Sequence, residues 1–233
     1  MQALHGANVW EDARLQRQID ALGIKGEAEP YGSPLDTRTL QMMINMTNPT
    51  LFLEVGVFRG ATSMRVARMF EKQKRFKNSF VISMDTWLLD LRFVWGAKQR
   101  AMHGAYFGNV QPAGSSQMYF SFLANVLSAK VSHRIIPLQT ASANGAMALI
   151  AKKLRPDLMY IDASHSNPDV FIDYENLFTI LRPGGVMAVD DVDLVPAVRQ
   201  SFQALCKRYN LKATYKPGDR KNQAWVLKPL HFD

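Results

Sequence analysis

The sequence predicts an α/β protein with a doubly wound, mostly parallel sheet of seven strands. Short apolar segments alternate five times with segments of helical spacing along the 233 residues, which is typical of parallel β-α units. The first apolar segment runs directly into a glycine loop, "EVGVFRG", as a strand does before a ligand-binding turn. The last two apolar segments have no helix between them, which predicts a C-terminal antiparallel hairpin.

The elements follow in order along the chain. Residues 1–33 are polar and mixed, which predicts an N-terminal extension of helix and loop, and 34–233 form one domain that begins with a helix. The expected strands cover 50–56, 80–85, 134–139, 157–162, 185–191, 212–217 and 223–229. The helices that alternate with the first strands cover 61–75, 117–130, 143–154, 168–181 and 194–209.

Composition and charge narrow the class of protein. An apolar content of 47% and a charged content of 21% are those of a globular chain. The net charge of +8 is spread along the sequence, which favours solvated faces over a nucleic-acid footprint. Without a signal-peptide pattern or a long apolar run, and with Cys206 as the single cysteine, we expect a cytoplasmic protein that does not enter a membrane.

The glycine loop and Asp85 suggest a nucleoside ligand. Gly56 allows a tight turn, and Gly60 lets the following helix start close to a ligand. The spacing departs from the three-glycine dinucleotide fingerprint, since position 58 is Phe, and a plain strand-to-helix turn is the alternative. Asp85, at the end of the second strand, is placed to accept hydrogen bonds from ribose hydroxyls, or else to cap the segment that follows.

Carboxylates at the ends of two strands predict a metal site. Asp162 ends the fourth strand, and Asp190 and Asp191 end the fifth, which should be its neighbour. Three converging carboxylates would repel one another unless a cation or protons held them, and hard oxygen ligands without cysteine favour Mg²⁺. The alternative is that the acidic pair caps the next helix. His165 follows Asp162 by three residues, so it is either a general base beside the metal or a structural histidine.

These segments resemble the class I S-adenosylmethionine-dependent methyltransferases. The residues that carry the resemblance are "LEVGVFRGATSMRVAR", "SMD", "YIDASH" and "LRPGGVMAVDD". The chain is similar to the metal-dependent small-molecule O-methyltransferases, a group that includes catechol O-methyltransferase and enzymes that methylate antibiotic sugars. The resemblance implies a Rossmann-like methyltransferase fold and gives each motif a role. It places the cofactor at Glu54, Gly56, Gly60, Thr62, Asp85, Ala141 and Ser142, and Mg²⁺ at Asp162, Asp190 and Asp191.

Two departures bear on the substrate. Catechol enzymes carry a lysine base where this chain has His165, and bulky residues where it has Ala163 and Ser164. The segment 86–132 is long and aromatic, which predicts a lid or substrate wall, unless its aromatics form a separate apolar cluster. The candidate substrate contacts in it are Trp87, Phe93, Trp95, Tyr106 and Phe107.

The expected function is methyl transfer from S-adenosylmethionine to a hydroxyl of a sugar, polyol or phenol. Mg²⁺ would position the substrate oxygens, and Asp162 and His165 would be the catalytic pair, with His165 as the base. The alternatives are a nicotinamide-dependent oxidoreductase, a nucleic-acid methyltransferase and a non-catalytic cofactor-binding protein. The sequence leaves open whether the chain forms a homo-oligomer.

Overall fold

The computed structural model describes residues 2–30, 32, 35–88, 117–216 and 222–232. Its centre is a seven-stranded sheet in the order β3-β2-β1-β4-β5-β7-β6. The strands are β1 (Leu51–Val55), β2 (Phe80–Asp85), β3 (Ile135–Gln139), β4 (Leu158–Ile161), β5 (Val186–Val189), β6 (Thr214–Tyr215) and β7 (Ala224–Leu227). The first five pair in parallel, and β7 pairs antiparallel with both β5 and β6. The predicted fold class and C-terminal hairpin are confirmed.

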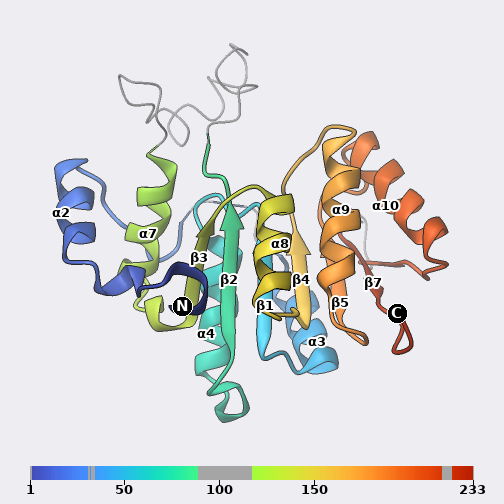
Figure 1. Ribbon diagram of the computed structural model, residues 1–233, viewed down its shortest axis with the longest axis horizontal. Coiled ribbons are helices and arrows are strands. Elements are labelled where there is room, and N and C mark those ends of the chain that lie inside the picture. Colours follow the sequence, from blue (N-terminus) through green and yellow to red (C-terminus); the bar gives the residue numbers. More distant parts are fainter. Residues whose placement is uncertain (1, 31, 33–34, 89–116, 217–221, 233) are drawn as a thin grey trace.

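Helices cover both faces of the sheet (Figure 1). One core packs α3 (Thr37–Thr47), α4 (Ala61–Glu71) and α7 (Met118–Ser128) against strand residues such as Phe52. A second core packs α8 (Ser142–Ala151), α9 (Asp169–Ile180) and α10 (Pro196–Arg208) against their neighbours, such as Leu53. Successive strand residues point to opposite faces, so strands covered on both faces are continuously apolar, as the sequence shows.

Helix ends differ from the predicted ones by a few residues. The helix expected over 61–75 ends at Glu71, and a 3₁₀ turn over Lys74–Phe76 follows it. The turn brings the buried Phe76 ring to 5.0 Å from the Phe70 ring, between centroids, so the chain must leave the helix axis to bury it. Another 3₁₀ turn, Ser132–Arg134, leads into β3. No helix within the described ranges is both long and apolar enough to cross a membrane.

The N-terminal residues lie along the edge of the sheet at β3. They form α1 (Gln2–His5), a 3₁₀ turn over Val9–Glu11, and α2 (Ala13–Ala21), which lies beside α7 (Figure 1). The Trp10 indole donates a hydrogen bond to the carbonyl of Ile135 at 2.8 Å, and the His5 ring contacts the carbonyl of Pro137. These side chains occupy backbone groups that an edge strand would otherwise offer to another chain.

Candidate active site at the carboxyl edge of the sheet

A cavity of about 560 Å³ opens where the parallel strands end. Its walls come from the loops after β1, β2, β3 and β4, the edge at which α/β proteins bind ligands. Its size is in the range of small-molecule and cofactor sites. The predicted site residues among its walls are Gly56, Asp85, Ala141, Ser142, Asp162 and His165. The structure thus brings together residues that the sequence places in four separate segments.

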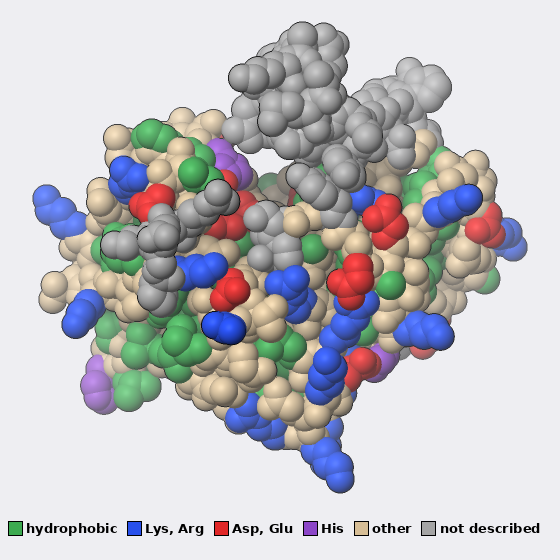
Figure 2. Space-filling view, turned by 180° about the vertical axis from the view of Figure 1, so that it is seen from behind, with side chains coloured by type: hydrophobic (Ala, Val, Ile, Leu, Met, Phe, Trp, Pro, Cys, Tyr) green, Lys and Arg blue, Asp and Glu red, His purple; other side chains and the backbone are tan. Residues whose placement is uncertain are grey.

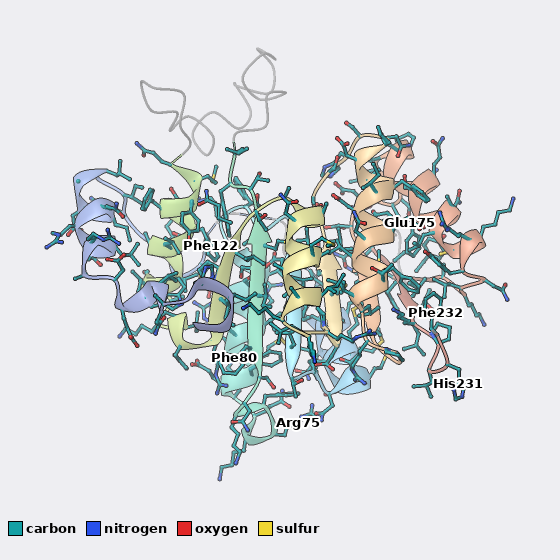
Figure 3. All side chains as sticks on the ribbon, in the orientation of Figure 1. Arg75, Phe80, Phe122, Glu175, His231 and Phe232 are labelled. Carbon is teal, nitrogen blue, oxygen red and sulfur yellow. The ribbon has the colours of Figure 1, made fainter. Side chains whose placement is uncertain are left out.

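Two glycines of the loop lie so close to other parts of the protein that a side chain would not fit. Gly56 has a φ of +83°, and a Cβ built on it would lie 2.0 Å from the carbonyl oxygen of Asp162. Gly60 has a φ of +91°, and its Cβ would lie 2.8 Å from the ring of Phe122, which lies between α7 and the sheet (Figure 3). Both glycines are therefore required by contacts within the protein, whereas the sequence suggested a tight turn at Gly56 and a close approach of the helix to a ligand at Gly60.

Phe58 stands in the glycine loop at a position where a dinucleotide fingerprint would have a glycine. Its φ is +52°, a left-handed conformation that bulky residues rarely adopt. Both of its backbone groups are held: its N–H donates to Asp85 Oδ2 at 2.9 Å, and its carbonyl accepts from the Trp87 indole at 2.8 Å. These bonds stabilise the strained loop next to the cavity.

Asp85 lines the cavity and also organises the loop. Its carboxylate accepts from the N–H groups of Val57 at 2.7 Å and Phe58 at 2.9 Å, and from that of Trp87 at 2.8 Å. Burial raises the pKa of Asp85, and these backbone donors oppose that rise. Part of the acceptor capacity that the sequence assigned to ribose is thus used within the protein.

Glu54 and Thr62 lie behind the cavity wall. Glu54 is buried and accepts a hydrogen bond from Ser63, and its desolvation raises its pKa to about 8. The Thr62 hydroxyl accepts from the N–H of Leu35 at 3.2 Å. Neither belongs to the residues that line the cavity, so their predicted contact with the cofactor would have to be indirect.

Asp173 is an acidic residue of the cavity that the sequence analysis did not single out. Asp173 lies in α9, where no strand end marks it, and its carboxylate bonds to the Ser142 hydroxyl at the start of α8. Desolvation raises the pKa of Asp173. It brings a carboxylate to the β3 side of the cavity, beside Ala141.

Asp162, His165 and Asp191 meet at the β4 side of the cavity. His165 Nε2 lies 2.8 Å from Asp191 Oδ2 and 3.8 Å from Asp162 Oδ1. One ligand atom from each of the three residues falls within 4.8 Å of the others. Burial raises the pKa of Asp162 to about 7, and the charges of Asp190 and Asp191 add to the rise, whereas His165 opposes it.

Asp190 bonds to Tyr160 within the protein, unlike the other two predicted metal ligands. Its Oδ2 accepts from the Tyr160 hydroxyl at 2.6 Å, and its Oδ1 accepts from the N–H of Asp191 at 2.9 Å. It is buried and is absent from the group of adjacent ligand atoms found among the described residues. Asp191 follows β5 with a φ of +57°, and its carboxylate contacts His165 while that of Asp190 stays bonded to Tyr160. His165 is the third residue of that group, and the role of Asp190 as a metal ligand stays a prediction.

The aromatic segment is described only at its ends. Trp87 lines the cavity but is 2% exposed, and its ring packs 4.8 Å from the Phe122 ring, between centroids. The position of Trp87 thus fits both interpretations of this segment, a cavity wall and a separate apolar cluster. Phe93, Trp95, Tyr106 and Phe107 lie outside the described residues.

Three solved structures share the fold over nearly the whole chain. An O-methyltransferase from Bacillus cereus in complex with SAH is 16% identical, with a TM-score of 0.55, and covers 97% of this chain and 96% of its own. The O-methyltransferase TomG of Streptomyces achromogenes, involved in tomaymycin synthesis and solved with SAM, is 17% identical, with a TM-score of 0.58 and coverage of 98% and 90%. The calicheamicin methyltransferase CalS11 is 15% identical, with a TM-score of 0.51 and coverage of 96% of each chain.

Sequence comparisons give the family. No curated protein sequence matches the chain significantly. The profile of a family described as a methyltransferase domain matches residues 53–192, which is more than half of the chain and includes the glycine loop and the acidic pair. The resemblance to class I methyltransferases is thereby confirmed, and the chain belongs to this methyltransferase domain family.

Proposed function

We propose that the protein transfers a methyl group from S-adenosylmethionine to a hydroxyl oxygen of a small molecule. The observation that carries the proposal is the group Asp162, His165 and Asp191: Asp162 and His165 line the cavity together with Asp85 and Ser142, and Asp191 lies next to His165. O-methyltransferases with this fold, one solved with SAH and another with SAM, support the cofactor and the acceptor atom.

The cavity residues fit the cofactor in chemistry. Gly56, which carries no side chain, lines the cavity directly after β1. Three carboxylates, Asp85, Asp162 and Asp173, line the described walls without a lysine or arginine among them, which suits a ligand that carries a sulfonium. In this proposal Asp85 binds the ribose, and Asp173, beside Ser142, accepts a hydrogen bond from the amino group of adenine.

The donor set at β4 fits a divalent cation. Asp162 and Asp191 offer carboxylate oxygens, which suit Mg²⁺ or Mn²⁺. Asp190 accepts a hydrogen bond from the backbone N–H of Asp191 and so helps to hold that residue in place. When bound, such an ion lowers the pKa of a hydroxyl and holds it in place. The raised pKa of Asp162, about 7, means that protons compete for this site near neutral pH.

His165 is the proposed base. It lies at the end of the cavity nearest to the two carboxylates and is partly exposed, with 23% of its side chain accessible. After it accepts a proton, its positive charge is stabilised by Asp191, 2.8 Å away. The attack on the methyl carbon itself needs only that the hydroxyl and the cofactor be held in line.

A methyl-transfer assay tests the proposal. The protein is treated with a chelator, then supplied with Mg²⁺ or Mn²⁺ and a panel of sugars, polyols and phenols, and the formation of S-adenosylhomocysteine is followed. We expect cation-dependent turnover, which Asp162→Asn and Asp191→Asn lower while affinity for the cofactor changes little. Full turnover of the chelator-treated protein would remove the cation from the proposal, and methylation of nucleic acid alone would replace the substrate class.

The face of the protein shown in Figure 2 favours a small-molecule substrate over nucleic acid. On the face shown in Figure 2, lysines and arginines are interspersed with acidic side chains and do not form a continuous basic stripe. A phosphate backbone would be recognised by clustered positive charge. The proposed cytoplasmic location and the oligomeric state remain expectations from the sequence.

A further inference from the structure

Asn125 is a polar side chain in an apolar helix. It lies on α7 and is fully buried, with 0% exposure, between the apolar residues Ala124 and Val126. Burying an amide costs free energy unless its donors and acceptors are satisfied. Its partners therefore indicate why this position tolerates a polar group.

The two ends of the Asn125 amide join different segments. Nδ2 donates to the carbonyl of Arg59 at 3.0 Å, and Oδ1 accepts from the N–H of Glu27 at 2.7 Å. One partner is a carbonyl and the other an N–H, so only this orientation of the amide satisfies both. The side chain is a bridge between the N-terminal extension and the glycine loop.

Two further contacts reinforce the bridge. The Arg59 guanidinium, 11% exposed, pairs with Glu27 Oε1 at 2.7 Å, which closes a ring through the three residues. Next to it, a Cβ on Gly26 would lie 2.2 Å from the carbonyl oxygen of Ala124, so the extension runs against the backbone of α7. We call Glu27, Asn125 and Arg59 the loop brace.

The loop brace acts one peptide away from the cavity. Arg59 lies between Gly60 and Phe58, and the N–H of Phe58 is bonded to Asp85. Asp85 thus holds the glycine loop from the cavity side, and Asn125 holds it from the α7 side. The strained left-handed conformation of Phe58 lies between these two anchors.

We propose that Asn125 is a positioning residue that couples the N-terminal extension to cofactor binding. The loop brace keeps the glycine loop in its binding conformation, so its loss reduces the fraction of protein ready to bind. By reciprocity, a bound cofactor stabilises the contact between residues 24–29 and α7. This inference rests on the proposed cofactor and assigns a role to the extension that the methyltransferase activity alone does not.

Two variants and a matched control test the coupling. Asn125→Leu removes both hydrogen bonds, and Asn125→Asp keeps the acceptor for Glu27 but loses the donor to Arg59. Thr47→Val is the control, because it removes a buried hydrogen bond to Met43 at the end of α3, remote from the loop. We expect both Asn125 variants to raise the Kd for S-adenosylhomocysteine roughly tenfold, the effect of one lost buried hydrogen bond.

The readouts separate positioning from stability. At saturating cofactor, kcat of the Asn125 variants should equal that of the wild type, whereas Thr47→Val should lower the melting temperature without changing Kd. In the wild-type protein, S-adenosylhomocysteine should also slow hydrogen exchange over residues 24–29, which needs no variant to fold. Unchanged exchange there, or a folded Asn125 variant with the wild-type Kd, would overturn the inference alone. A wild-type protein that binds no S-adenosylhomocysteine would overturn the proposed function with it.

Discussion

The backbone conformation of Asp191 orients its side chain toward the site. Its φ is +57°, a left-handed conformation that aspartate tolerates better than most residues. The turn directs its carboxylate to His165, while Asp190, the residue before it, stays bonded to Tyr160 inside the protein. Two adjacent and identical residues thus make different contacts, and the second of them has a left-handed backbone conformation.

The role of His165 is tested by its removal. As the base, it should contribute roughly two to four orders of magnitude to turnover, so His165→Ala should lose that much kcat. Affinity for the cofactor and for Mg²⁺ should stay nearly unchanged, because neither contact needs the imidazole. A large loss of Mg²⁺ affinity would instead make His165 a ligand, and normal turnover with a lower melting temperature would make it structural.

Glu54 provides a test by pH. Burial raises its pKa from about 4.5 to about 8, so between these values the unfolded chain releases a proton that the folded protein keeps. This carboxyl therefore makes the free energy of unfolding fall as pH rises through that window. Glu54→Gln does not titrate, so it should gain stability relative to the wild type, by a few kcal/mol, between about pH 5 and pH 8. Urea unfolding at both pH values measures this, and parallel pH dependence of the two proteins would contradict it.

Asp173 provides a test of cofactor orientation. If its carboxylate accepts from the adenine amino group, the wild-type protein should bind S-adenosylhomocysteine at least tenfold more tightly than the inosine analogue, which presents an oxygen there. Asp173→Asn should narrow that ratio, because an amide can donate to the oxygen. Asp169→Asn, at an exposed site one turn earlier on α9, is the control. Equal ratios in all three proteins would place the adenine elsewhere.

The sequence located most site residues but not their contacts. Asp85 ends β2, Asp162 follows β4, and Ser142 begins α8 shortly after β3. Strand ends meet at one edge, so chain position alone brings these residues to the cavity. The different directions of Asp190 and Asp191 go with the left-handed φ of Asp191, which no residue pattern encodes. Asp173 arrives through the packing of α8 on α9, a tertiary contact without a local signature.

At the scale of elements, Lys228 holds the end of α9. It is 2% exposed, and its Nζ donates to the carbonyls of Phe178 at 2.8 Å, Thr179 at 3.1 Å and Leu181 at 2.8 Å. These are among the carbonyls that a helix leaves without an intrahelical partner. The ammonium also lies 4.8 Å from the centre of the ring of Phe232, labelled in Figure 3.

Lys228→Met should therefore unfold the protein more easily. Buried carbonyls would lose their donor, which should lower the free energy of unfolding by about 2–4 kcal/mol. The Kd for S-adenosylhomocysteine should stay the same, because Lys228 contacts the C-terminal end of α9 and the cavity residue Asp173 lies nearer its start. Lys212→Met, at an exposed lysine, is the matched control. Chemical denaturation measures both, and a loss no larger than that of the control would show that the three hydrogen bonds add little.

Most elements could be predicted from the sequence because strands buried on both faces are uninterrupted apolar runs. The five strand-helix alternations and the reversed last strand follow from that pattern. The early end of α4 at Glu71 could not be predicted, since it follows from the packing of Phe76 on Phe70. Likewise, nothing in residues 1–33 marks Trp10 and His5 as partners of the β3 edge.

In the whole molecule, the strand order explains where the chemistry lies. The sheet order reverses between β1 and β4, so the loops after these two strands lead to opposite faces and leave a crevice between them. Gly56 follows β1 and packs against the backbone of Asp162, which follows β4. The glycine loop and the group of Asp162, His165 and Asp191 therefore border the same crevice. A methyl donor bound on one side would meet an acceptor held on the other.

A calorimetric titration of the wild-type protein with S-adenosylhomocysteine, and separately with NAD, tests the central claim most directly. The glycine loop lacks the third glycine of a dinucleotide site, and the described cavity walls carry carboxylates where a pyrophosphate would need positive charge. We therefore predict saturable binding of S-adenosylhomocysteine with a stoichiometry near one and no binding of NAD. Saturable binding of NAD without any binding of S-adenosylhomocysteine would contradict it.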